Sequence, residues 1–131
     1  MSVTLQKRGG SGSGGYRLPC ETTVSVGDYV YIQPDGVLDK AIASDITTMP
    51  AIGKVSSKPS ANVCIVSDKL IDSDYTGVTP KGQMFVSGSV AGTIEDVPPA
   101  GANVVIQQVG IGLSNEQVLV DIDASNIVIR T

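Results

Sequence analysis

Two similar stretches of this sequence, which begin at residues 27 and 82, predict the fold. Residues 82–86, Gly-Gln-Met-Phe-Val, open the second occurrence, and residues 27–32, Gly-Asp-Tyr-Val-Tyr-Ile, open the first. Three further matches follow at nearly the same spacing of 55 to 57 positions: residues 36–38 with 92–94, 52–53 with 109–110, and 62–66 with 117–121. Self-similarity at a fixed period indicates duplicated supersecondary units. We therefore predict two quasi-repeats of about 55 residues, at 22–68 and 77–123.

The composition favours strands over helices. The chain has 15 Gly and 7 Pro and is rich in Val and Ile, which suits turns and pleated strands. No segment shows a helical period, so we predict an all-β fold, a small barrel or sandwich, as a single domain at 16–131. Four Tyr, one Phe and no Trp leave the core to aliphatic side chains. Because each repeat is small, we expect the two copies to pack on each other or on neighbouring chains.

Alternating runs bounded by turn residues predict the individual strands. They are expected at 28–33, 37–42, 50–56, 62–67, 69–72, 83–87, 93–97, 103–113, 117–122 and 127–129. Residues 43–49 are predicted to be a polar connector, with a short helical turn that Ser44 could cap. In the strand at 103–113, odd positions from Val105 to Leu113 predict one apolar face, whereas Gly110 and Gly112 predict a bulge or the close approach of another backbone.

Residues 1–15 are predicted to form a flexible N-terminal arm. Val3 and Leu5 alternate with polar residues, and a Gly/Ser-rich linker follows at 9–15. An apolar pair on such a tether favours docking on another subunit, and ordinary terminal disorder is the alternative. Val3 and Leu5, with the neighbouring cations Lys7 and Arg8, are therefore our candidate partner-binding residues.

The charge distribution excludes some classes of partner. The net charge is −4, with +3 in the first 20 residues and −7 in the remainder. Nucleic-acid binding needs a basic footprint, so we expect no nucleic-acid partner. The sequence has no apolar run of ~20 residues and no recognisable signal peptide. We expect a soluble protein that is made in a cytoplasm and does not bind a membrane.

The side chains available for catalysis are few, and we expect no enzyme, no cofactor and no metal site. The chain has no His, which removes the usual general base and most zinc sites. Two cysteines, Cys20 and Cys64, are too few for a disulfide scaffold and are predicted to be reduced, buried thiols. Asp68, Asp72 and Asp74 could gather around Ca²⁺, although their spacing is not that of an EF-hand loop. Whether they bind an ion stays open.

A second motif points to a different class of protein. Asp39-Lys40-Ala41 follows the strand that contains Asp28 and Val30, an arrangement similar to the lipoyl-carrier pattern, in which a lysine at a hairpin tip carries the lipoyl group. Here Lys40 is predicted to lie within a return strand rather than at a turn. A lipoyl-like carrier domain modified on Lys40 is therefore kept as an alternative.

The repeated pattern resembles modules of tailed-bacteriophage particles, namely capsid decoration (cement) proteins and head-fibre or spike modules. The resemblance covers residues 22–123 and is carried by residues 77–87, Gly-Val-Thr-Pro-Lys-Gly-Gln-Met-Phe-Val-Ser, and 108–114, Gln-Val-Gly-Ile-Gly-Leu-Ser. It implies a homotrimer on the outer capsid surface that bridges and stabilises the major capsid protein, with Lys7 and Arg8 meeting acidic coat surface. A head- or tail-fibre module that binds a host surface is the alternative within this resemblance.

Overall fold

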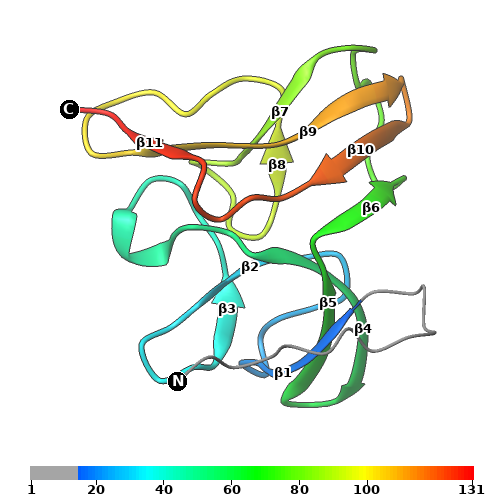
Figure 1. The fold of residues 1–131 in the computed structure, drawn as a ribbon, viewed down its shortest axis with the longest axis vertical. Coiled ribbons are helices and arrows are strands. Elements are labelled where there is room, and N and C mark those ends of the chain that lie inside the picture. The colour runs from blue at the N-terminus through cyan, green and yellow to red at the C-terminus, as the bar shows by residue number, and fades with distance from the viewer. Residues whose placement is uncertain (1–14) are drawn as a thin grey trace, which may run out of the picture.

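The computed structural model describes residues 15–131, and this part of the chain is all-β (Figure 1). It contains two antiparallel sheets and one 3-10 turn, with no α-helix among the described residues. A β-sandwich fits this arrangement. The predicted all-β class is confirmed.

The first sheet has the strand order β1-β5-β4-β2-β3. Its strands are β1 (Tyr16–Pro19), β2 (Tyr29–Ile32), β3 (Leu38–Lys40), β4 (Gly53–Ser60) and β5 (Val63–Ser67).

The second sheet has the order β6-β10-β9-β7-β8, with β11 also paired to β9. Its strands are β6 (Lys69–Asp72), β7 (Gln83–Val86), β8 (Ile94–Glu95), β9 (Val105–Ser114), β10 (Gln117–Asp121) and β11 (Ile127–Ile129). Apart from β11, this is the order of the first sheet with five added to each strand number. The turns β2–β3 and β7–β8 also each contain a glycine with positive φ, Gly36 at 85° and Gly92 at 80°, a conformation that side chains disfavour.

Backbone hydrogen bonds tie the two halves of the chain together. Ala41 O accepts from Gly92 N at 2.8 Å, and Ala43 bonds both Ser87 and Val105, each at 2.8 Å. The segment that follows β3 is thus held by residues of the second half. Such bonds satisfy backbone groups that would otherwise be buried without a partner.

The larger core cluster draws side chains from both halves. Tyr29, Met49 and Ala51 come from the first half, and Val86 and Val118 come from the second; all are buried. A smaller cluster lies within the first half alone. The two halves therefore share one apolar core.

Several predicted boundaries differ from the observed ones. The short helical turn exists as η1 (Ile46–Thr48), but Asp45 rather than Ser44 caps it, because the Asp45 carboxylate accepts from Thr47 N at 2.9 Å. β4 runs through Pro59, where a connection was predicted. Its pairing with β2 involves only the start of β4, so the Pro59 nitrogen is not needed as a donor to β2.

The single apolar face predicted for β9 is wrong. Val105 and Val109 are buried, but Ile111 and Leu113 are each 45% exposed. The cause is a bulge: on β7, Met84 pairs with Gly110 whereas the next residue pairs with Gln108, so Val109 is an extra residue. A bulge shifts the period-two alternation by one position, which sends the later odd residues to the outer face.

The close backbone approach predicted at the β9 glycines is confirmed. A Cβ atom at Gly110 would collide with the Leu119 carbonyl, and one at Gly112 would collide with the Thr79 carbonyl. Only glycine fits at these two positions without a shift of the neighbouring backbone.

The prediction of two reduced thiols is also wrong, because Cys20 and Cys64 form a disulfide with a Cα–Cα distance of 6.1 Å. Leu18 of β1 pairs with Cys64 of β5, so the chain leaving β1 brings Cys20 next to Cys64. The count of two cysteines could not reveal this pairing, which depends on strand register. The bridge closes a sequence separation of 44 residues within the smaller core cluster.

We predict that replacing both cysteines by alanine lowers the free energy of unfolding by about 2–4 kcal/mol, because a cross-link over this loop length restricts the unfolded chain. Urea denaturation of the two proteins measures the difference. In parallel, the denatured wild-type protein without reductant should show no free thiols in a thiol-reagent assay. Two free thiols per chain would contradict the bridge.

Candidate functional site

The four partner-binding residues proposed from the sequence, Val3, Leu5, Lys7 and Arg8, lie outside the described residues. Their role therefore stays a prediction. The described residues offer two features of their own: a buried charged cluster between the sheets, and an exposed apolar face on the second sheet.

The buried cluster is centred on Lys54 of β4. Its Nζ lies 2.7 Å from Asp72 Oδ1 and 2.6 Å from Asp74 Oδ2. The Tyr29 hydroxyl donates to Asp72 Oδ2 at 2.6 Å. The Asp72 side chain is fully buried and that of Lys54 is 8% exposed, whereas that of Asp74 is 66% exposed. Since β4 belongs to the first sheet and β6, which ends at Asp72, to the second, the cluster joins the two sheets.

The cluster shows what Asp72 and Asp74 do in this structure. Their carboxylates face the Lys54 ammonium, and Asp72 Oδ1 also accepts from Asp74 N at 2.9 Å. Asp68 is not part of the cluster. Within residues 15–131, no three His, Cys, Asp or Glu side chains are grouped so that they could hold a metal ion. In this structure, the positive charge that faces Asp72 and Asp74 is the Lys54 ammonium.

Two tyrosine hydroxyls near the cluster are shifted in their acidity. Burial, reinforced by the hydrogen bond to Asp72, raises the pKa of Tyr29 far above its usual value. Burial also raises the pKa of Tyr75 to about 12. The Tyr75 hydroxyl accepts from Ile94 N at 3.3 Å. Both hydroxyls therefore stay protonated at neutral pH and act as hydrogen-bonding groups.

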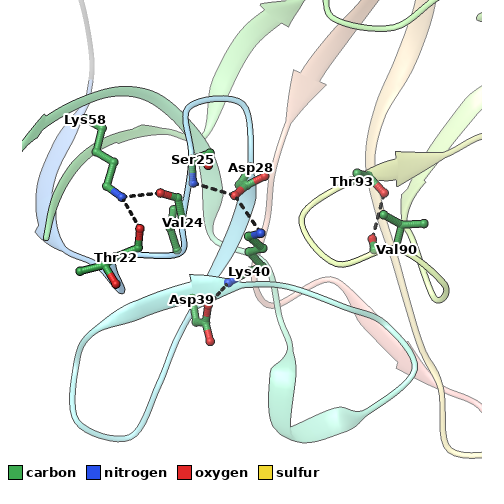
Figure 2. A network of polar contacts seen from close by, with 9 residues as sticks. All are labelled: Thr22, Val24, Ser25, Asp28, Asp39, Lys40, Lys58, Val90 and Thr93. Carbon is green, nitrogen blue, oxygen red and sulfur yellow. Dashed lines mark hydrogen bonds and ion pairs between the residues drawn. The ribbon is translucent and has the colours of Figure 1, made fainter. Parts of the chain in front are cut away.

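Lys40 lies within β3, as predicted from the sequence, and points toward Asp28 (Figure 2). Its Nζ is 4.0 Å from Asp28 Oδ2, an oxygen that also accepts from Ser25 N at 2.8 Å. Nearby, the Lys58 ammonium donates to the carbonyls of Thr22 and Val24. Lys40 is thus at a strand position beside a carboxylate and is not at a hairpin tip.

The second feature is a row of exposed aliphatic side chains on the second sheet. Leu119 of β10 pairs with Ile71 of β6 on one side and with Ile111 of β9 on the other. These three side chains are 47%, 55% and 45% exposed, respectively. We call Ile71, Leu119 and Ile111 the apolar row. Leu113, two positions along β9, is also 45% exposed and extends this apolar surface.

The first sheet presents different chemistry at the matching strands. There Ile65 of β5 pairs with Arg17 of β1 and with Ser57 of β4. A basic and a hydroxyl side chain thus flank the one aliphatic residue. Because contiguous apolar surface on a soluble protein often marks an interaction site, the apolar row of the second sheet is the better candidate.

Sequence patterns found only part of the apolar row. Apolar and other residues alternate along 117–122, which predicts that Val118 and Val120 point inward. The burial of both valines confirms this and leaves Leu119 outward. Ile111 was assigned to the buried face because the apolar face was predicted to continue unbroken along the strand. A bulge was one of the two features predicted from Gly110 and Gly112, but its effect on Ile111 was not anticipated. No sequence signal gave the register that brings Ile71 next to Leu119.

A hydroxyl–carboxylate group near β8 does not form an activated nucleophile. The Ser87 Oγ donates to Glu95 Oε1 and accepts from the backbone N–H groups of Ser89 and Val90. With these acceptor positions occupied, the hydroxyl shapes the turn after β7. A neighbouring hollow of about 300 Å³ is lined by Glu95 and by the apolar residues Val97, Pro98 and Pro99.

Comparison with protein-family models, curated proteins and solved structures returns no match. Among residues 15–131 there is also no helix of the length and hydropathy needed to cross a bilayer. The functional argument therefore depends on the residues and their geometry.

We predict that Asp72→Asn lowers the free energy of unfolding by about 3 kcal/mol, since removing one charge of a buried pair leaves the other poorly compensated. Asp74→Asn is the matched control and should cost under about 1 kcal/mol, because that carboxylate is largely exposed. Urea denaturation compares the variants. Equal losses would contradict the assignment of Asp72 as the main partner of Lys54.

A second prediction concerns alkaline pH. The folded state holds the Tyr75 proton up to a pKa of about 12, whereas the unfolded state releases it near 10.0. The resulting stability is fully present below pH 10.0 and is lost as pH rises toward 12. Tyr75→Phe should therefore give a shallower fall in stability over this window, measured by urea denaturation at successive pH values. An unchanged slope would contradict the raised pKa.

Proposed function

We propose that this protein is a structural, non-enzymatic component of a virion: a capsid decoration (cement) subunit that binds the outer capsid surface as a homotrimer and stabilises the shell. The observation that carries this proposal is the apolar row on the outer face of the second sheet. Ile71, Leu119 and Ile111 are large, adjacent and about half exposed. Burying them against another protein would lower the free energy in proportion to the apolar surface area that is removed from water.

The rest of the body supports a structural role. Both cysteines form an internal disulfide, Lys54 and Asp72 form a buried ion pair, and backbone bonds join the two halves. A disulfide also suits a protein displayed on the surface of a released particle, where the surroundings are oxidising. The proposed partners are therefore further copies of the chain and the major capsid protein.

The finer architecture belongs to the same proposal. We infer that residues 22–68 and 77–123 are quasi-repeats, which the shared strand order and the corresponding turn glycines Gly36 and Gly92 support. Duplication explains why two small units share one core. Residues 1–15 are assigned as an N-terminal arm that binds a partner through Val3, Leu5, Lys7 and Arg8.

The alternatives gain no specific support. A host-binding fibre or spike module would be favoured by several exposed aromatic side chains. Tyr29, Tyr31 and Phe85 are buried, and among residues 15–131 Tyr16, at 58%, is the one largely exposed aromatic side chain. A lipoyl carrier would be favoured by a lysine at a turn, whereas Lys40 lies in β3. An adduct on Lys40 in the intact mass of protein from a lipoylating host would revive the carrier.

The proposal predicts a trimer in solution of about 40 kDa, from three chains of 13.5 kDa, measured by light scattering. The protein should co-sediment with expanded capsids that lack it and should raise the temperature at which they rupture. Bovine serum albumin serves as the control for non-specific co-sedimentation. No binding to capsids by the intact trimer would overturn the decoration role.

A further inference from the structure

β6 (Lys69–Asp72) is an edge strand of the second sheet, because it pairs only with β10. Ile122 N donates to Asp68 O at 2.8 Å, next to the β6–β10 ladder. Hydrogen-bonded pairs alternate in an antiparallel ladder. Leu70 and Asp72 are therefore the β6 residues that bond β10, and the backbone groups of Lys69 and Ile71 face the free edge.

This edge is occupied only in part. Lys69 O accepts from the Ser67 hydroxyl at 2.9 Å, while the backbone N–H and C=O of Ile71 point away from β10. The Ile71 side chain is 55% exposed and begins the apolar row. A strand added beside β6 would therefore gain both main-chain hydrogen bonds and an apolar neighbour.

The chain itself contains a segment with matching chemistry. Residues 2–6, Ser-Val-Thr-Leu-Gln, alternate so that Val3 and Leu5 would project to one face of an added strand. The segment is joined to β1 by residues 7–15, which can span up to about 30 Å when extended. A tether of this length lets the segment extend beyond its own body.

Charge also favours this pairing. Of nine basic and thirteen acidic residues, Lys7 and Arg8 lie in the arm, so residues 15–131 have a net charge of −6. Asp68 precedes β6, and Asp74, whose largely exposed carboxylate also faces Lys54, follows it. A strand that runs in either direction along β6 thus brings Lys7 and Arg8 near a carboxylate.

We propose that the free edge of β6 accepts residues 2–6 of a second copy of this chain as an added β-strand, with Val3 and Leu5 extending the apolar row. This inference rests on the proposed function and specifies how its subunits associate. The arm of each copy covers the apolar surface of its neighbour, and the backbone of Ile71 supplies the bonds that define the register.

The test compares self-association of full-length variants by sedimentation velocity over a concentration series. Ile71→Pro removes the outward N–H but keeps the bonds of Leu70 and Asp72 to β10, so the edge is blocked with the sheet retained. Val3→Ser/Leu5→Ser changes only the arm. Ile32→Thr, at a 52% exposed position of the first sheet, is the control for loss of an exposed aliphatic side chain.

We expect the dissociation constant of self-association to rise about tenfold or more in Ile71→Pro and in Val3→Ser/Leu5→Ser, the scale expected when a buried apolar contact is lost. Ile32→Thr should leave it unchanged. The Ile71 amide should exchange slowly in the wild-type oligomer and rapidly in Val3→Ser/Leu5→Ser. Should Ile71→Pro fail to fold, the arm variant and this amide decide the question.

The outcomes separate this inference from the proposed function. If Val3→Ser/Leu5→Ser loses capsid binding but keeps wild-type self-association and slow Ile71 exchange, the arm binds the coat protein and the inference is overturned, although the decoration role stands. If the variants dissociate as expected but the wild-type protein does not bind capsids, the decoration role fails and the inference stands. A wild-type protein that is strictly monomeric overturns the inference.

Discussion

The buried ion pair between Lys54 and Asp72 is the interaction on which the arrangement of the two sheets depends. A lysine side chain that is 8% exposed and an aspartate side chain that is fully buried are costly to bury, and their mutual contact and further hydrogen bonds offset that cost. Tyr29 supplies one of those bonds from a second strand of the first sheet. The relative placement of the sheets must therefore keep three side chains from β2, β4 and β6 together.

Around this pair, the polar groups of the interior are satisfied. Buried Gln107 both donates to and accepts from the backbone of Ala51, which again links the second half to the first. No buried side-chain nitrogen or oxygen within residues 15–131 lacks a hydrogen-bond partner. Because the buried polar groups have partners, the features still able to bind another molecule lie on the outside. They are the apolar row and the free backbone edge of β6. Satisfied buried polar groups are the norm in folded proteins, so the proposed association rests on these two outer features.

Local patterns were enough to predict much of the fold. The strands at 69–72 and 127–129 were predicted at their observed bounds, because alternation and turn residues are local signals. The inward face of β10 and the tight contacts at Gly110 and Gly112 followed from the same reasoning. The apolar row could not be predicted as a unit, since it needs three strands in register and a bulge at Val109 that moves Ile111 outward. For the candidate site, local patterns predicted the arm residues, whose role stays a prediction, and the outward position of Leu119.

Local residue patterns predicted the all-β class and the approximate positions of most strands and turns, because these follow from side-chain period and from the conformational limits of Gly and Pro. They missed β1 (Tyr16–Pro19) and the full length of β4. The pairing partners came from the tertiary structure alone. It joined Cys20 to Cys64 and Lys54 to Asp72, pairs that lie 44 and 18 positions apart in the chain, and it aligned Ile71 with Leu119 and Ile111. The physical reason is that long-range register depends on how all strands pack at once, and no local pattern of residues encodes that packing.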